Sequence, residues 1–412
     1  MSATPPRSAE PIELIVGPIA HGGHCVARVD GQVVFVRHAL PGERVRAVIT
    51  EERGGFLRAD AVEVLEPSAD RVEPPCRYAR PGLCGGCDFQ HATPEAQREL
   101  KGAVVREQLA RLGGLSAEEL AALAVRVEPL PGAALGWRTR VQYSADADGR
   151  LGFHRHRSAE VVPVDRCPIA HPEIQALPLT DQRWPAGSAV EAVVSSDAEV
   201  TVFSRRSRND RRVELISGPR TTFEIAGDRG FAVAADGFWQ VHPAAPDTLT
   251  DAVLTMLRPR DGERAWDLYG GAGLFTVALA GAVGERGRVT LVESDPRGVA
   301  AARRNVADLP QVRVVRADVR VALADPRWRS VDLVVLDPPR SGAGREVVQA
   351  VTARRPRAVA YVACDPAAFA RDVATFAAKG WRLTGLRAFD AFPMTHHVEV
   401  VGLLAVAEPG TV

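Results

Sequence analysis

The second half of the chain alternates short apolar runs with segments long enough to form helices. Strands that alternate with helices in this way are typical of a doubly wound sheet with helices on both faces. From about Ala234 onward the sequence therefore predicts an α/β domain with a Rossmann-like sheet. Its predicted strands are Arg264–Leu268, Val289–Val292, Val312–Ala317, Val331–Leu336 and Ala358–Ala363, with Trp381–Phe389 and His397–Val406 closing the sheet.

Glycines and acidic residues follow several of these strands. The first strand leads into Asp267-Leu268-Tyr269-Gly270-Gly271-Ala272-Gly273, where glycines let the backbone approach a ligand ahead of a helix. Glu293 ends the next strand, about twenty residues later, where a carboxylate can bind ribose hydroxyls. Asp337-Pro338-Pro339-Arg340 follows a later strand, and its prolines predict a rigid loop. The pattern indicates a nucleoside-binding crevice, although the glycine turn alone also fits a dinucleotide.

A thiol follows the apolar strand Ala358–Ala363. Cys364 is the only cysteine after Cys167, and Asp365-Pro366 comes directly behind it. Side chains just past the carboxyl end of a parallel strand open into the ligand crevice of an α/β sheet. This position predicts a nucleophile, and the alternative is a buried structural cysteine that packs as a small hydrophobe.

The first part of the chain has a different sequence pattern, with short runs of alternating apolar and polar residues. Five short runs, Glu13–Val16, Cys25–Val29, Gln32–Val36, Glu43–Thr50 and Leu57–Leu65, are separated by glycine turns such as Gly22-Gly23 and Asp30-Gly31. This spacing predicts a small all-β, OB-like barrel, and the block resembles a TRAM-type RNA-binding barrel. We expect its polar side chains to face RNA, the alternative being an ordinary solvated surface. These side chains are His21, His24, Arg28, Arg37 and His38.

Four cysteines are arranged as metal ligands. Cys76, Cys84 and Cys87 follow a proline-rich linker, with Cys-Gly-Gly-Cys in a glycine turn, and Cys167 lies far along the chain in Asp-Arg-Cys-Pro-Ile. Four thiolates complete a tetrahedral set, and both zinc and a [4Fe–4S] cluster fit that number. We expect a structural metal centre that ties Cys167 to the first loop.

Two clusters of basic residues lie between Cys87 and the α/β domain, the first of them before Cys167. Arginines beside aromatic rings suit a surface that contacts phosphates and stacks bases. The alternative is an ordinary solvated surface, because arginine is the usual basic residue of this chain. The first cluster, near Trp137, Tyr143 and Phe153, contains Arg138, Arg140, Arg150, His154, Arg155, His156 and Arg157. The second contains Arg205, Arg206, Arg208, Arg211 and Arg212. The helix Thr93–Leu112 and the strands Leu135–Tyr143 and Leu151–Val164 complete this predicted central region.

Composition limits the remaining possibilities. Hydrophobic residues make up 46% and charged residues 25%, as in ordinary soluble proteins, while Lys+Arg and Asp+Glu are both 51, so any basic patch must be local. No apolar run approaches the roughly 18 residues of a membrane span, and the first residues do not resemble a signal peptide. We expect a cytoplasmic protein that requires no protein partner, whose cysteines serve metal binding or catalysis.

Taken together, these motifs resemble one family. Asp267 through Gly273, Glu293 and the Asp-Pro-Pro loop are similar to S-adenosylmethionine-dependent methyltransferases. With Cys364 and the segment Phe392-Pro393-Met394-Thr395-His396-His397-Val398-Glu399 added, nearly the whole chain resembles the bacterial RNA uracil-C5 methyltransferases. That resemblance implies a disordered tail at residues 1–7, a TRAM-like barrel at 8–66, a mixed central RNA-binding domain at 67–235 and a methyltransferase domain at 236–412.

The resemblance also implies roles for individual residues. Cys364 becomes the nucleophile and Glu399 the general base. S-adenosylmethionine becomes the methyl donor and a [4Fe–4S] cluster the metal centre, with zinc as the alternative. The cofactor-binding residues it implies are Gln240, Tyr269, Glu293 and Asp337, and the metal ligands are Cys76, Cys84, Cys87 and Cys167. His242 and Met394 depart from the family pattern, which leads us to expect asparagine and histidine there.

The substrate implied is RNA, with 23S ribosomal RNA favoured because relatives with the amino-terminal barrel mostly act on large ribosomal RNA. Transfer RNA is the first alternative. A catalytically silent, metal-containing RNA-binding protein is a second, from another class. A cytosine-C5 methyltransferase is less favoured because the predicted catalytic domain contains only one cysteine, and a dehydrogenase because Gly-x-Gly-x-x-Gly is missing.

Overall fold

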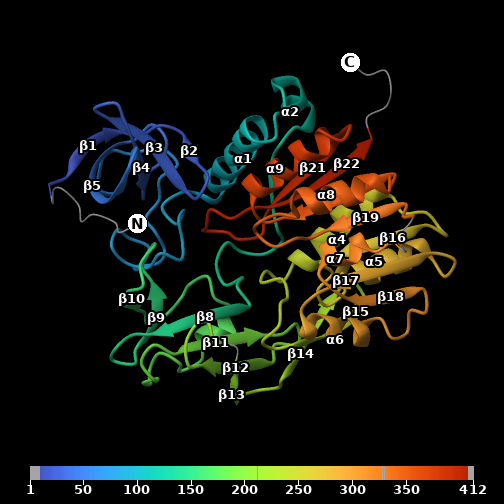
Figure 1. The fold of residues 1–412 in the computed structure, drawn as a ribbon. Coiled ribbons are helices and arrows are strands. Elements are labelled where there is room, and N and C mark those ends of the chain that lie inside the picture. The colour runs from blue at the N-terminus through green and yellow to red at the C-terminus, as the bar shows by residue number, and fades with distance from the viewer. Residues whose placement is uncertain (1–9, 211, 327, 329, 407–412) are drawn as a thin grey trace.

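The structure is a computed structural model that describes residues 10–210, 212–326, 328 and 330–406. The predicted tail at residues 1–7, and Arg211 of the second arginine cluster, lie outside these residues. Figure 1 shows three parts, a small barrel near the N-terminus, a central region of mixed structure and a large sheet flanked by helices. No helix in the described part of the chain is both long and apolar enough to cross a membrane.

The barrel is a six-stranded sheet that curls around its own core, of which Leu14, Val34 and Val45 are part. Asp30 and Gly31 both have positive φ, the geometry that a two-residue hairpin turn needs. The five predicted strands are present, and a sixth, two-residue strand precedes Gly22. Its strands are β1 (Ile12–Ile15), β2 (Ile19–Ala20), β3 (His24–Val29), β4 (Gln32–Arg37), β5 (Arg44–Arg53) and β6 (Phe56–Glu66), in the order β1-β5-β6-β4-β3-β2.

The central region begins with helix α1 (Pro94–Arg111), which the Thr93 side chain caps by accepting a hydrogen bond from the amide of Ala96. A six-stranded antiparallel sheet and a separate hairpin, β14–β15, follow. The remaining elements are α2 (Ala117–Leu123), β7 (Val127–Pro129), β8 (Arg140–Ala145), β9 (Leu151–His154), β10 (Val161–Pro163), α3 (Pro172–Gln175), β11 (Ala189–Val194), β12 (Val200–Arg205), β13 (Glu214–Ser217), β14 (Thr221–Ala226) and β15 (Arg229–Ala234).

Two predicted strands of this region are wrong in extent. The predicted strand at 135–143 starts only at Arg140, because Gly136 has φ +72° and breaks the extended backbone. The predicted strand at 151–164 is a hairpin of β9 and β10, whose connection contains Arg157 at φ +54°.

The large sheet has the order β18-β17-β16-β19-β20-β22-β21-β7. Neighbouring strands from β18 to β20 are parallel, whereas β22 is antiparallel to both β20 and β21. Its elements are α4 (Ala245–Leu257), β16 (Arg264–Leu268), α5 (Leu274–Val283), β17 (Arg288–Glu293), α6 (Pro296–Asn305), β18 (Val312–Arg316), α7 (Val319–Ala324), β19 (Leu333–Leu336), α8 (Gly344–Ala353), β20 (Ala358–Ala363), α9 (Pro366–Ala377), β21 (Trp381–Asp390) and β22 (Glu399–Val406).

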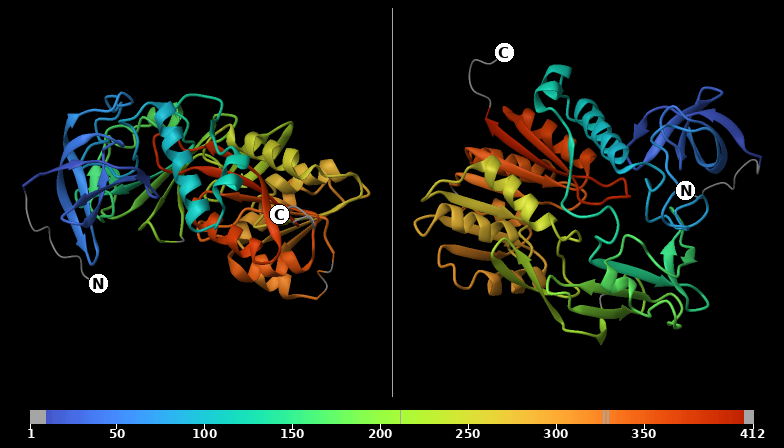
Figure 2. Two further views of the ribbon diagram at one scale, coloured as in Figure 1. Left: turned by 90° about the horizontal axis from the view of Figure 1, so that it is seen from above. Right: turned by 180° about the vertical axis from the view of Figure 1, so that it is seen from behind.

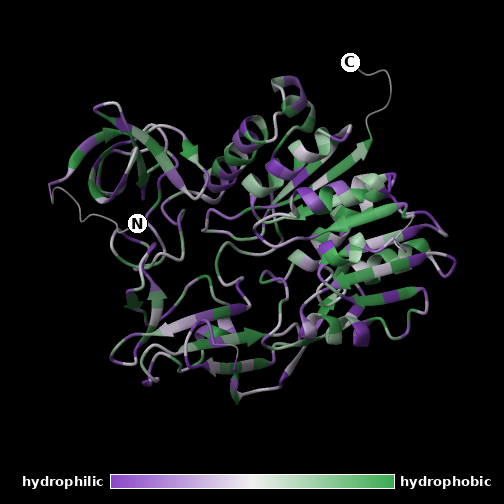
Figure 3. Cartoon of the chain, in the orientation of Figure 1, coloured by the Kyte–Doolittle hydropathy of each residue, from purple (hydrophilic) through white to green (hydrophobic). Residues whose placement is uncertain are grey.

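Two hydrophobic cores cover the two faces of this sheet. Alternate strand residues point to opposite sides, so Tyr361 packs in one core and Val362 in the other. Helices α4, α5 and α6 contribute to one core, and α1, α7, α8 and α9 to the other. Figure 2 shows helices on both faces of the large sheet. In Figure 3 the strands are coloured mostly as hydrophobic, as expected for strands buried on both faces. Helix α1 and strand β7, which belong to the central region in sequence, therefore pack with the large sheet. The domain boundaries inferred from the sequence stay predictions.

Candidate active site

The predicted catalytic residues meet at the edge of the large sheet where its parallel strands end. Strand β20 ends at Ala363, and the antiparallel neighbour β22 begins at Glu399, with Ala363 paired with Val400 in register. Because the two strands run in opposite directions, the end of one lies beside the start of the other. Cys364 and Glu399 both line a cavity of about 1180 Å³ at this edge.

The Cys364 thiol is half-buried and opens into this cavity instead of packing in the core. Burial raises its pKa to about 11, the nearby Glu399 carboxyl adds to the effect, and Arg340 opposes it. The thiol is therefore protonated at neutral pH in this structure, and Arg340 is a cation that favours the nucleophilic thiolate.

Glu399 is only 4% exposed. Burial raises the pKa of this carboxyl well above its usual range, Asp337 adds to the rise, and Arg340 again opposes it. The sequence interpretation placed Glu399 within a continuous strand from His397, but Glu399 is the first residue of β22. Its side chain is therefore at the edge of the sheet, beside the strand end that precedes Cys364.

The glycine turn after β16 lies at the same edge. Tyr269 has φ +68°, which is unusual for a residue other than glycine, and a Cβ added at Gly270 would lie 2.5 Å from Leu291 Cγ. The turn is therefore closely packed against the sheet on one side. On the other side Gly271 faces open space, since a Cβ added there would meet no atom within 4 Å.

Acidic groups surround this turn. One oxygen of Glu293 accepts a hydrogen bond from the Gly271 amide at 3.0 Å, and the other accepts from the amides of Ser294 and Asp295, each at 2.6 Å. Burial, together with Asp267, raises the pKa of Asp337 to about 7. The four predicted cofactor-binding residues, Gln240, Tyr269, Glu293 and Asp337, all line the one cavity.

The four predicted metal ligands line another part of the same cavity. Burial raises the pKa of Cys84 to about 11, and the thiols of Cys167 and Cys76 add to the rise, so the cysteines are close enough to interact. Burial and Cys167 likewise raise the pKa of Cys87 well above its usual range. Within the described residues, no three His, Cys, Asp or Glu side chains converge so as to hold a single metal ion.

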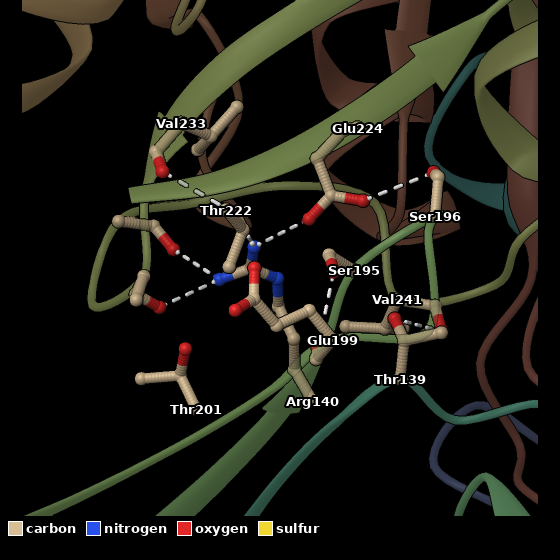
Figure 4. Close-up of polar contacts among 12 residues, drawn as sticks. Thr139, Arg140, Ser195, Ser196, Glu199, Thr201, Thr222, Glu224, Val233 and Val241 are labelled. Atoms are coloured by element: carbon tan, nitrogen blue, oxygen red, sulfur yellow. Dashed lines mark hydrogen bonds and ion pairs between the residues drawn. The ribbon is translucent and has the colours of Figure 1, made fainter. Parts of the chain in front are cut away.

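Some members of the two arginine clusters line the cavity, one is buried, and others, such as Arg150 and Arg206, are exposed elsewhere. Arg138, Arg155, Arg157 and Arg208 line the cavity. The prediction that Arg140 faces RNA is wrong, because this side chain is 7% exposed and bound to Glu224 at 3.0 Å. Figure 4 shows its guanidinium directed at Glu224. The guanidinium also donates to the backbone carbonyls of Ala235 and Gly237, each at 2.9 Å.

Two predictions for the barrel surface are wrong for the same reason. His24 and Arg37 are 3% and 6% exposed, and both lie where the barrel packs against other parts of the chain. His21 and Arg28 are exposed, and His38 is half-buried. Burial lowers the pKa of His24 to about 3, so this imidazole is neutral and offers RNA no charge.

The two departures from the family pattern are both buried. His242 stacks on Trp137, with ring centroids 5.8 Å apart. Met394 packs in the same small core as Trp137, and its amide donates to Gln97 Oε1 at 2.8 Å. Each residue therefore has a packing role in this chain.

Two further cavity-lining residues received no role from the sequence. Arg340, at the end of the Asp-Pro-Pro loop, is exposed and lowers the pKa of both Cys364 and Glu399. Phe238 stands two residues before Gln240 and is 70% exposed, although large aromatic rings are usually buried. Both residues could have been found from the sequence, because each lies in a motif in which another residue was predicted to bind the cofactor.

Comparisons with known proteins give matches along most of the chain. Residues 10–62 match the TRAM domain family, and residues 222–407 match a family described as tRNA (Uracil-5-)-methyltransferase. An uncharacterized RNA methyltransferase of Streptomyces coelicolor is 48% identical, with 97% of this chain and 94% of that protein covered. A 23S rRNA (uracil(1939)-C(5))-methyltransferase of Alkalilimnicola ehrlichii is 34% identical, with 95% of each chain covered.

Among solved structures, one from Pyrococcus abyssi shares the fold. It is a tRNA (uracil-54, C5)-methyltransferase in complex with S-adenosyl-L-homocysteine, with a TM-score of 0.71. The two chains are 22% identical, and the match covers 96% of this chain and all of that one.

Proposed function

The chain belongs to the RNA uracil-C5 methyltransferase family, and we propose that it methylates carbon 5 of one uridine through a covalent bond between Cys364 and carbon 6 of the base. The observation that supports this most is the meeting of a thiol and a buried carboxyl at one strand end, in a cavity with Arg340. Carbon 5 of uracil is a weak nucleophile, so a reaction there requires prior activation of the ring.

The chemistry follows from these groups. Cys364 first gives up its thiol proton to water, a loss that Arg340 favours, and the thiolate then adds to carbon 6 while the electron pair of the carbon 5–carbon 6 double bond moves into the ring as an enolate. Carbon 5 then attacks the electrophilic methyl group that S-adenosylmethionine supplies, the bond between this methyl group and the sulfonium sulfur breaks, and S-adenosylhomocysteine leaves. Glu399 removes the proton left on carbon 5, the double bond re-forms, and the carbon 6–sulfur bond breaks to release Cys364.

The cavity around the glycine turn fits the methyl donor. Gly271 leaves open space beside the backbone, and Glu293 places a carboxylate where ribose hydroxyls of a nucleoside can bind. We propose that Gln240, Tyr269, Glu293 and Asp337 bind the donor. Phe238, exposed beside them, offers a ring on which the target base can stack after it leaves the RNA stack.

We also propose that Cys76, Cys84, Cys87 and Cys167 bind a [4Fe–4S] cluster. The four thiols line one cavity and interact electrostatically, which supports a shared centre. Four thiolates also suit a tetrahedral zinc ion, so zinc is the alternative that the experiment must distinguish.

Purification without air is expected to give a brown protein that contains iron and acid-labile sulfide, measured by absorbance and elemental analysis. Cys167→Ala should lose the colour, whereas Cys25→Ala should keep it, because Cys25 is buried in the barrel core. A colourless protein with one zinc per chain would contradict the cluster.

For the substrate we propose 23S ribosomal RNA. The amino-terminal TRAM barrel and relatives such as the one from Alkalilimnicola ehrlichii, at 34% identity over nearly the whole chain, support this choice. Transfer RNA is the alternative, because the family that residues 222–407 match is described by that substrate.

Purified enzyme is expected to methylate protein-free 23S ribosomal RNA at one uridine and to leave transfer RNA unmodified. Mass spectrometry of nuclease fragments identifies both the modified base and its position. If the enzyme methylated transfer RNA but not ribosomal RNA, the substrate would be transfer RNA, and the proposed uracil-C5 chemistry would still stand.

A further inference from the structure

The barrel contacts the loop that presents Cys364. The turn between β2 and β3, residues 21–23, places His21 Nε2 3.3 Å from Asp365 Oδ2. Asp365 follows Cys364 directly and caps α9, because its other oxygen accepts the Ala368 amide at 2.7 Å. The barrel therefore binds the residue that sets the direction of the chain immediately after the thiol.

The same turn packs on the loop that leads to Glu399. Gly23 is buried and has φ +77°. A Cβ added at Gly23 would lie 2.9 Å from His396 Cβ and 3.0 Å from Asp88 Cβ. The backbone of the barrel turn thus approaches both residues as closely as only glycine allows.

Asp88 links this turn to the loop before Glu399 by several bonds. Its Oδ2 accepts the His396 amide at 3.0 Å and lies 2.6 Å from His396 Nδ1. Its Oδ1 lies 3.5 Å from Nη2 of Arg37, on barrel strand β4. The amides of Asp88 and Phe89 both donate to the Met394 carbonyl at 3.0 Å. These contacts attach the segment 394–396, just before Glu399, to the barrel and to the loop of the cysteines.

From this arrangement we infer that the barrel turn, residues 21–23, is a positioning element of the active site that fixes the two loops presenting Cys364 and Glu399. This inference rests on the proposed roles of those two residues. A barrel that served only as an RNA anchor would have no need to enter the catalytic edge. Here the docking of the barrel and the alignment of nucleophile and base are coupled through His21, Gly23 and Asp88.

Removal of the His21 contact tests the link to Cys364. In full-length enzyme, His21→Ala is expected to lower kcat about three- to tenfold, the range for the net loss of one ordinary hydrogen bond, with the KM for RNA unchanged. His21→Gln should restore most of kcat, because its amide can donate to Asp365 from a similar position. Arg46→Ala, which removes an exposed barrel ion pair with Glu63, serves as the matched control and should change neither constant.

Gly23→Ala tests the packing on the second loop. Displacement of His396 and Asp88 is expected to lower kcat about ten- to a hundredfold, the range for small misplacements of catalytic groups. Gly31→Ala is the control, since Gly31 has a similar φ of +79° but a Cβ there meets nothing within 4 Å. Backbone strain is then equal in both variants, and only the collision differs. If Gly23→Ala does not fold, the His21 series decides alone.

A covalent trap separates this inference from the proposed function. In RNA containing 5-fluorouridine, carbon 5 carries no proton that Glu399 could remove, so the adduct with Cys364 accumulates. The rate at which this adduct forms measures the reactivity of the Cys364 thiol. Slower trapping by His21→Ala, with unchanged RNA binding, supports the inference. A higher KM with unchanged kcat and trapping would overturn it and leave the barrel as an RNA anchor. If the unmodified enzyme forms no adduct, the proposed chemistry itself fails.

Discussion

Cys364→Ala is expected to abolish methyl transfer, with a loss of more than about a thousandfold, because the other cysteines that line the cavity are the four proposed metal ligands and none of them follows strand β20 beside Glu399. Binding of S-adenosylmethionine should be unchanged, because Cys364 does not belong to the glycine turn or to the acidic groups around it. The measurements are transfer of a labelled methyl group to RNA and calorimetric titration with the methyl donor.

Cys25→Ala provides the matched control, since it removes a cysteine that lies in the barrel core and not in the cavity. Methylation by Cys364→Ala at a rate comparable to that of the unmodified enzyme would show that the covalent mechanism is wrong. Loss of both activity and donor binding would instead indicate that Cys364 supports the fold of the pocket.

Glu399→Gln should fail at a different step. Addition of Cys364 and methylation of carbon 5 both precede proton removal, so this variant is expected to accumulate a protein–RNA adduct that survives denaturation. Multiple turnover should fall by about a hundredfold or more, the usual contribution of a positioned general base. Denaturing gel electrophoresis with labelled RNA detects the adduct, and mass spectrometry places it at Cys364.

The double variant Cys364→Ala, Glu399→Gln is the sharpest control and should give no adduct at all. Glu285→Gln, at an exposed carboxylate away from the cavity, should behave as the unmodified enzyme. Rapid turnover by Glu399→Gln, with no adduct at any time, would assign proton removal to another group.

Much of the large sheet could be predicted because its central strands β19 and β20 are uninterrupted apolar runs, and because a glycine turn or an acidic residue lies at the end of several strands. Both faces of these strands are buried, so the sequence pattern reports burial directly. Cys364 could be placed at a strand end by the same argument. The position of Glu399 relative to Cys364 could not be obtained this way, because it depends on the antiparallel register of β22 against β20.

The predictions that failed concern charged residues with distant partners. Arg140 looks like its exposed neighbours in sequence, and only the fold brings Glu224 and the carbonyls of Ala235 and Gly237 around it. Arg37 is buried because Asp88 lies opposite it. A local pattern of basic residues cannot distinguish a surface from an internal ion pair, since the pairing is set by contacts across the whole chain.

Strand β7 has a consequence for how the catalytic sheet is completed during synthesis. The sheet ends at three residues, Val127–Pro129, that pair with β21 although they precede it by some 250 positions. Until β21 and β22 have left the ribosome, this short segment has no partner, and the catalytic sheet cannot be finished. Conversely, a fragment starting at residue 236 would leave the backbone of β21 open at its outer edge, where a second chain can add as a strand. The amino-terminal half thus covers an edge strand of the catalytic half that could otherwise pair with a second chain and aggregate.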